Sequence, residues 1–188
     1  MSKIEWCDIT WNVAWGCSYG CGFCYARKIS YRFAEVIARR EAKFSMYDED
    51  SYLRFYNQFE EELANFEFTV LKSQFKVKFR KKPAIIFANS MFDIADLTKK
   101  RLSWEKFIAK VEEYPQHTFI VLTKRPQELL DVYFPENVIV GVSCINQSMY
   151  EKNAPVLMQI SAERKLISFE PLWGHIELNP KYPVDWII

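Results

Sequence analysis

Residues 118–125 read TFIVLTKR, a β-branched and apolar run that ends in three polar side chains. Strands that are buried in a parallel sheet have this near-continuous apolar character. Similar runs recur after residue 83, and stretches with helical periodicity separate them. Strands that alternate with helices predict βαβ units, a parallel sheet and therefore an α/β fold. The four expected strands are Ala84–Ala88, Thr118–Leu122, Val138–Val142 and Leu166–Phe169.

Polar residues follow each of these runs. The carboxyl ends of parallel strands meet at one edge of a sheet, where barrel-type enzymes build their sites. We therefore expect a shared pocket, against the simpler explanation that strands end where polarity rises. For the last residue, Glu170, an ordinary ion pair with Lys or Arg is an equal alternative. The candidates are Asn89, Ser90, Thr123, Lys124, Arg125, Ser143 and Glu170.

The helices between and before the strands are visible as apolar periodicities. Ser103 is expected to cap one helix, Pro126 to open a short one, and a third falls within residues 148–160. In the first half, a helix over about 25–42 should bury Ile29, Phe33, Val36 and Ile37. A second helix should begin near residues 48–51 and bury an aromatic stripe, namely Tyr52, Tyr56, Phe59, Leu63 and Phe66.

The cysteines carry the clearest chemical signal. Three of the five, Cys17, Cys21 and Cys24, have the spacing C-x3-C-x2-C within one short segment. Three thiolates in one loop bind three irons of a [4Fe–4S] cluster and leave the fourth iron for another ligand. A structural zinc site needs four ligands, and a ferredoxin-type cluster needs a fourth cysteine nearby. The other candidate ligands are unpaired in the sequence: Cys7, Cys144, His117 and His175.

Composition limits the class of protein. The 188 residues fit a single domain, 1–188, and 49% are hydrophobic. The sequence has neither a membrane-spanning run nor a signal peptide, so we expect a cytoplasmic protein. A net charge of +1 gives no general attraction to nucleic acid. The basic stretch over 72–82 alternates with apolar residues, which predicts a strand with a solvated face, or alternatively a phosphate-contacting edge.

The cysteine spacing, with the aromatic Phe23 before the third cysteine, is similar to the signature of the radical S-adenosylmethionine (SAM) superfamily. The whole chain resembles an uncharacterised bacterial and phage radical SAM family, first named after phage gene products. The matching segments are Ile4–Trp6 with Thr10–Asn12, Gly16–Cys17, Cys21 with Cys24–Ala26, Asn89–Met91 with Asp93, Leu122–Pro126, Gly141–Ser143 and Ser168–Leu172.

This resemblance implies a partial (β/α)6 barrel with the cluster loop after the first strand. The cofactors would be a [4Fe–4S] cluster on Cys17, Cys21 and Cys24, and SAM, which is cleaved to a 5′-deoxyadenosyl radical that takes hydrogen from an unknown substrate. Phe23 belongs to the cofactor site in this interpretation. SAM contacts would come from Asn89 and Ser90 (amino group), Thr123, Lys124 and Arg125 (carboxylate), Ser143 (ribose) and Glu170.

The resemblance also implies partners. A reducing protein of the flavodoxin or ferredoxin type would supply electrons, and the phage association favours a nucleobase, nucleotide or nucleic acid as substrate. The alternative from another class is a non-catalytic metal-binding or partner-binding module. Two positions depart from the family pattern: Cys7 replaces a threonine, and Ile145 replaces an acidic residue. Cys144 neighbours Ser143, so we expect its thiol to pack on the opposite face.

The C-terminal residues 184–188 predict a sixth strand beside the one that ends at Glu170. In the resembling family this segment continues into further sequence, so we expect a barrel that is open and truncated after strand six. An open sheet edge exposes unpaired backbone groups. A second copy or another polypeptide is therefore expected to cover it.

Overall fold

The computed structural model describes residues 4–46 and 48–188, and its centre is a six-stranded sheet with every neighbouring pair parallel. The order β1-β4-β5-β6-β7-β8 leaves the sheet open between β1 and β8. The four predicted strands and the α/β class are confirmed. The strands are β1 (Ile9–Thr10), β4 (Ile85–Phe87), β5 (Thr118–Thr123), β6 (Val138–Ser143), β7 (Arg164–Ser168) and β8 (Trp186–Ile187).

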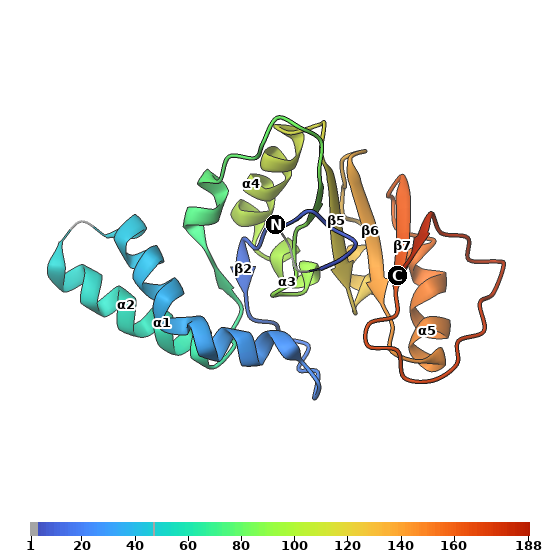
Figure 1. Cartoon of the computed structure of the whole chain (residues 1–188), viewed down its shortest axis with the longest axis horizontal. Helices are drawn as coiled ribbons and strands as arrows, with labels where there is room; N and C mark the ends of the chain where they lie inside the picture. The colour runs from blue at the N-terminus through green and yellow to red at the C-terminus, as the bar shows by residue number, and fades with distance from the viewer. Residues whose placement is uncertain (1–3, 47) are drawn as a thin grey trace.

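Helices occupy most of the connections between these strands (Figure 1). A separate antiparallel pair, β2 with β3, flanks the two long helices that precede β4. The remaining elements are β2 (Ala14–Trp15), α1 (Tyr25–Ser45), α2 (Glu49–Ala64), β3 (Thr69–Val70), the 3₁₀ helix η1 (Lys72–Lys76), α3 (Ile94–Thr98), α4 (Arg101–Glu112), the 3₁₀ helix η2 (Pro126–Leu129) and α5 (Gln147–Leu157).

The two faces of the sheet pack into different cores because strand side chains alternate. Phe119 and Val121 of β5 belong to the larger core, which also contains side chains of α4 and α5. Ile120, between them, belongs to a smaller cluster on the other face, against which Trp6 and Trp186 pack. We call this second face the inner face. Fewer buried side chains pack against the inner face than against the other face, so the ends of the strands stay accessible from this side.

Trp11 fixes the short strand β1 to the rest of the larger core. Its ring stacks on Phe107 of α4, with centroids 5.3 Å apart and an interplanar angle of 9°. Its indole N–H donates to the carbonyl oxygen of Gln74 in η1 at 3.1 Å. A two-residue strand is thereby held by side-chain packing as well as by its pairing with β4.

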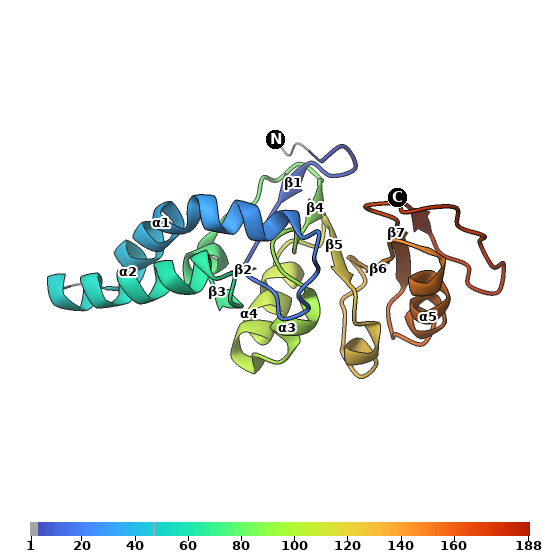
Figure 2. The ribbon, with the colours of Figure 1, turned by 90° about the horizontal axis from the view of Figure 1, so that it is seen from below.

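Helices α1 and α2 form a hairpin that projects sideways from the sheet (Figures 1 and 2). The side of α1 that meets α2 consists of small residues such as Ala34, which packs with Phe59 and Leu63 of α2. Phe33 and Val36 are 43% and 62% exposed, so the predicted buried stripe of α1 is wrong at these two positions. Its other two members, Ile29 and Ile37, are half-buried and pack against small buried clusters. Alanines allow the two helices to approach closely, and this contact sets the orientation of α1. The predicted aromatic stripe of α2 is confirmed at Phe59, Leu63 and Phe66, which are buried, while Tyr52 and Tyr56 are half-buried.

The basic stretch over 72–82 is not a strand, contrary to the prediction. It forms η1 and then continues without regular structure. Its alternation is nevertheless real, because Phe75 and Phe79 pack against the larger core while the basic side chains are exposed. The buried carboxylate of Glu41 accepts a hydrogen bond from the Ser73 N–H at 3.0 Å. Such anchors, with Trp11, determine the path of this segment.

Helix starts were predicted less well than helix positions. Ser103 lies inside the first turn of α4, whose N-cap is Lys100, so the predicted cap is wrong. Pro126 does open a helical turn, but of the 3₁₀ type. Asp48 caps α2 as expected and accepts a hydrogen bond from the Ser51 N–H at 2.9 Å.

The predicted sixth strand is confirmed. Trp186 and Ile187 of β8 pair in parallel with Leu166 and Ile167 of β7, at the edge of the sheet. A polypeptide covering this edge stays a prediction. None of the described helices combines the length and apolar character that crossing a membrane requires.

Candidate functional site

The three clustered cysteines lie in the loop that joins β2 to α1, and the first residue of this loop is tightly fixed. Gly16 has a φ of 87°, and its N–H donates to the carbonyl oxygen of Met91 at 3.1 Å. A Cβ atom at this position would lie 1.8 Å from the carbonyl oxygen of Glu67. Only glycine permits this conformation and this approach. The start of the loop is thereby held against the turn that follows α2.

The loop borders a pocket of about 570 Å³ at the carboxyl ends of the strands. The thiol-bearing residues Cys17, Cys21 and Cys24 all line the pocket, as does Phe23. Phe23 also contacts Trp173 edge to face, with ring centroids 4.8 Å apart. The shared pocket expected from the strand endings is present. The strand-end residues that line it are Asn89, Ser90, Thr123, Lys124, Ser143 and Glu170.

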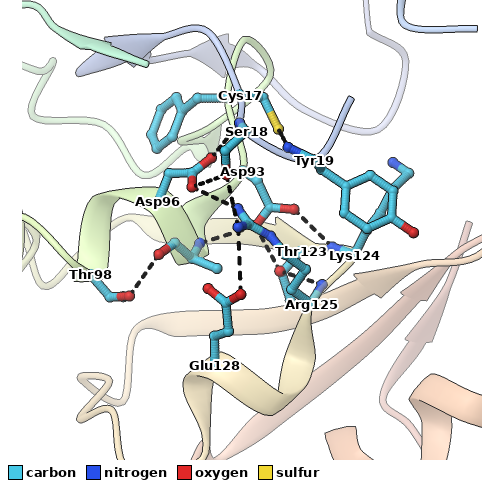
Figure 3. Close-up of polar contacts among 12 residues, drawn as sticks. Cys17, Ser18, Tyr19, Asp93, Asp96, Thr98, Thr123, Lys124, Arg125 and Glu128 are labelled. Atoms are coloured by element: carbon cyan, nitrogen blue, oxygen red, sulfur yellow. Dashed lines mark hydrogen bonds and ion pairs between the residues drawn. The ribbon is translucent and has the colours of Figure 1, made fainter. Parts of the chain in front are cut away.

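Arg125 is not among the residues that line the pocket, and it ties the cysteine loop to the end of β5 (Figure 3). Its guanidinium pairs with Asp96, with 2.9 Å between Nη2 and Oδ1, and donates to the Ser18 hydroxyl at 3.0 Å. Ser18 in turn donates to Asp96 through its hydroxyl at 2.6 Å and its N–H at 3.0 Å. The predicted contact of Arg125 with the carboxylate of SAM is therefore not supported by its position. Arg125 instead holds the cysteine loop in place.

The charge of Asp96 is stabilised within this network. Burial alone would raise the pKa of the Asp96 carboxyl, but the hydrogen bonds from Ser18 and the guanidinium of Arg125 outweigh it and hold the pKa below its usual range. Asp96 therefore stays ionised at neutral pH. The cysteine loop is held by a charged pair that is shielded from water.

Three other predicted residues also use their side chains in hydrogen bonds with other parts of the protein. Asn89 bridges β4 to β5, because its side chain donates to the Leu122 carbonyl at 2.6 Å and accepts from the Leu122 N–H at 2.8 Å. The Thr123 hydroxyl donates to Asp93 at 2.7 Å. The Ser90 hydroxyl is hydrogen-bonded to Asn12. These side chains shape the pocket more than they offer free polar atoms to a ligand.

Lys124, Ser143 and Glu170 keep polar capacity for a ligand. Lys124 Nζ lies 3.1 Å from Ser143 Oγ, and no ion pair of Lys124 occurs within the described chain. Glu170 Oε2 accepts hydrogen bonds from Trp6 Nε1 and the Ser168 hydroxyl, both at 3.2 Å. The alternative of a Glu170 ion pair with Lys or Arg is not observed among residues 4–46 and 48–188. The described pocket lining thus has one cation, Lys124, and two carboxylates, of which Asp93 already accepts hydrogen bonds from Thr123 and from the N–H of Lys124, while Glu170 keeps a free oxygen.

The cysteine loop carries three thiols beside open space. Ideal Cβ atoms on Gly20 and Gly22 would meet no atom within 4 Å, so open space borders the loop backbone. Burial raises the pKa of the Cys17 thiol to about 11, and it also raises the pKa of Cys21, against a smaller opposing effect of Lys124. A metal that bound these sulfurs would displace their protons.

No three Cys, His, Asp or Glu side chains in the described part of the chain are grouped as ligands of one metal ion. The ligands of a single zinc ion must converge on one point, whereas each thiolate of a cluster binds its own iron. The three thiols line one pocket, but they are not arranged around one point as the ligands of a single metal ion.

The other two cysteines lie elsewhere. Cys7 is buried in the small cluster on the inner face. Cys144 is fully buried in the larger core, while its neighbour Ser143 lines the pocket, so the predicted opposite orientation is confirmed. Sequence reasoning did not assign roles to Ser18 and Asp96. Ser18 and Asp96 form no recognisable sequence motif. The only signal available was the position of Ser18, directly after the first cysteine of the loop.

The fold and the site together define a mixed α/β protein with a parallel sheet and a cysteine-lined pocket at the carboxyl ends of its strands. The chain belongs to the family DUF5131, described as a protein of unknown function, whose family model matches residues 1–188. Comparison with curated proteins and with solved structures gives no match.

Proposed function

We propose that this chain is a radical SAM enzyme with a partial (β/α)6 barrel. Cys17, Cys21 and Cys24 would hold a [4Fe–4S] cluster, and SAM would bind across the strand ends. One observation carries the proposal: three thiols of a single loop line the same pocket as the carboxyl ends of four parallel strands. The cluster would supply one electron to SAM, whose carbon–sulfur bond breaks to give methionine and a 5′-deoxyadenosyl radical.

The chain's own residues supply binding and orientation for this chemistry. The ammonium group of Lys124, beside the Ser143 hydroxyl, suits the carboxylate of SAM. The free oxygen of Glu170 suits an amine or a hydroxyl donor of SAM. Phe23 presents an aromatic surface next to the third cysteine. The ion pair of Arg125 with Asp96 keeps the cysteine loop attached to the end of β5.

A metal-binding module without catalysis explains the cysteines but not the rest of the pocket. Such a module has no need for Lys124, Ser143 and Glu170 around the same cavity. An enzyme that binds a zwitterion such as SAM needs both charges. The proposal includes an external reductant of the flavodoxin or ferredoxin type and a cytoplasmic setting, because reduced thiols and low-potential electrons are maintained there.

Anaerobic reconstitution with iron and sulfide tests the cluster. We expect bound iron, sulfide and charge-transfer absorption in the wild-type protein, and their loss in Cys17→Ala, Cys21→Ala and Cys24→Ala. Cys144→Ala is the matched control, because this thiol is buried in the larger core. The cluster assignment fails if the wild-type protein binds zinc but no iron–sulfur species, or if Cys144→Ala loses the cluster as fully as Cys17→Ala does.

SAM titration tests the second half of the proposal. Removing a partner of a charged group costs about 1.5–3 kcal/mol, so Lys124→Gln should weaken SAM binding about tenfold or more. Lys106→Gln, an exposed lysine on α4, should leave the affinity unchanged. Release of 5′-deoxyadenosine under dithionite measures cleavage directly. Equal SAM affinity in the Lys124 variant and the wild type would place the SAM carboxylate elsewhere.

A further inference from the structure

Helix α1 carries a row of mostly apolar and mostly exposed side chains that begins at the pocket. The row advances by four, four, three, four and four residues, so its members share one side of the helix. Tyr25 and Val36 are 57% and 62% exposed, and Phe33 and Phe44 are 43% and 42% exposed. Isolated exposed apolar residues are common, but an aligned row indicates a binding surface. The exposed apolar members are Tyr25, Phe33, Val36 and Phe44, and the half-buried Ile29 and the exposed Arg40 lie between them in the same row.

A row of basic side chains runs beside the apolar row on the same helix. It contains Lys28, Arg32, Arg39 and Lys43, all exposed. Glu35 lies in this row and pairs with Arg39 at 2.7 Å. Lys28, Arg32 and Lys43 have no acidic partner within the described residues. We call the two rows together the α1 face.

The positive charge of the α1 face stands out because the whole chain carries a net charge of only +1. The neighbouring helix α2 is acidic, with Glu49 and Asp50 in its first turn and residues 60–62 all Glu. Charge is thus separated across the hairpin. A polyanion that approached the α1 face would meet cations without crossing the acidic helix.

The α1 face is continuous with the mouth of the pocket. Tyr25, its first member, lines the pocket, and its hydroxyl donates to the carbonyl oxygen of Ser90 at 2.7 Å. Two more aromatic side chains are exposed near this end: Tyr19 of the cysteine loop, and Trp173, which contacts Phe23. The 21 residues of α1 span about 30 Å. A flexible chain that lay along the helix would end at the cavity.

We propose that the α1 face binds single-stranded nucleic acid and leads one nucleotide into the pocket. The inference rests on the proposed function, because it names the substrate class of that site. Single strands expose a phosphate and an aromatic base at every nucleotide, and they bind surfaces that combine cations with aromatic side chains. The α1 face has this combination, whereas a protein partner would need an acidic and apolar groove of matching length.

Fluorescence anisotropy with labelled DNA and RNA strands of about ten nucleotides tests this proposal. We expect binding that weakens with salt, both in the metal-free and in the reconstituted protein. The double variant Lys28→Gln/Arg32→Gln should reduce the slope of log K against log salt by about 1.4, at about 0.7 per phosphate contact. Phe33→Ala should weaken binding about tenfold, through lost stacking.

Two controls match these variants. Lys81→Gln/Lys82→Gln removes the same charge from exposed residues just before β4, away from α1. Tyr31→Ala removes an aromatic ring that is 75% exposed but lies two residues from Phe33, on another side of the helix. Both should leave binding of the strand unchanged. Equal losses in the controls and the test variants would overturn the proposal.

Other ligands serve as competing outcomes. Duplex DNA or polyglutamate that bound as tightly as the single strand would reduce the effect to general charge attraction and overturn the proposal. Binding to phosphatidylserine vesicles without binding to the strand would assign the α1 face to a membrane surface instead. SAM cleavage without strand binding refutes this inference alone, while strand binding without a cluster refutes the proposed function.

Discussion

The sheet and the α1–α2 hairpin bury different kinds of side chain. In the sheet, large apolar residues such as Phe119 and Val121 are fully buried, as their pattern predicts. In the hairpin, Ala34 and Ala38 of α1 are buried while Phe33 is 43% exposed. This difference shows that the spacing of apolar residues in the sequence identifies the apolar side of a helix. It does not show whether another part of the same chain or a separate molecule covers that side. In the sheet the partner is the chain itself, and in α1 we infer an external one.

The largest expected effect is in the core of the sheet region. Phe107 is fully buried and stacks on Trp11, so Phe107→Ala should lower the free energy of unfolding by about 3–5 kcal/mol. Urea unfolding of the metal-free protein measures it. Phe107→Leu is the control and should cost less than about 1.5 kcal/mol. A loss below about 1 kcal/mol for Phe107→Ala would mean that this core is not tightly packed.

The next effect concerns the junction of the two regions at Gly16. Gly16→Ala should cost about 3 kcal/mol, because the new Cβ would overlap the Glu67 carbonyl and because φ is positive. Gly20→Ala is the matched control. Gly20 also has a positive φ, 73°, but open space around it, so this variant should cost only about 1 kcal/mol. Similar losses in the two variants would show that conformation, and not close approach, requires glycine at Gly16.

Much of the fold was accessible from sequence because its strands are buried on both faces. Continuous apolar runs mark such strands, and all four were found at nearly their observed bounds. The orientation of α1 was not accessible, because two of its sides were plausible and only the contact with α2 distinguishes them. The path of residues 72–82 was not accessible either, since anchors such as Trp11 and Glu41 come from distant parts of the chain.

The candidate site was predictable in position but not in the division of roles. Strand endings identified the residues that surround the pocket. The sequence could not show that the side chains of Asn89, Thr123 and Arg125 form hydrogen bonds and ion pairs with other residues of the protein and are therefore not free to bind a ligand. Hydrogen bonds between residues far apart in the chain decide this, and a single sequence carries no signal for them.

An intermediate effect is expected at the link between the cysteine loop and β5. Arg125→Gln removes the ion pair with Asp96 and the hydrogen bond to Ser18, and should cost about 2 kcal/mol. It should also speed the reaction of Cys17 with a thiol reagent in the metal-free protein. The control Arg101→Gln removes an exposed ion pair with Glu105 and should cost at most about 0.5 kcal/mol.

The stability of a double variant tests whether Ser18, Asp96 and Arg125 act as one network. Ser18→Ala combined with Arg125→Gln should cost less than the sum of the two single variants, because both remove partners of Asp96. Strict additivity would contradict a coupled network, and the positioning role assigned to Arg125 would then have to be abandoned.

The smallest effects separate the two sides of α1 most sharply. Ala34→Leu should destabilise the protein by about 1–2 kcal/mol, because the larger side chain must fit between α1 and α2. Ala109→Leu, at an exposed position of α4, is the matched control and should change stability by no more than about 0.5 kcal/mol. Phe33→Ala should also stay within about 0.5 kcal/mol, although it removes a whole aromatic ring. If Phe33→Ala cost several kcal/mol and Ala34→Leu cost nothing, the apolar row would be the buried side of α1 after all. The exposed α1 face, and the nucleic-acid surface inferred from it, would then not exist.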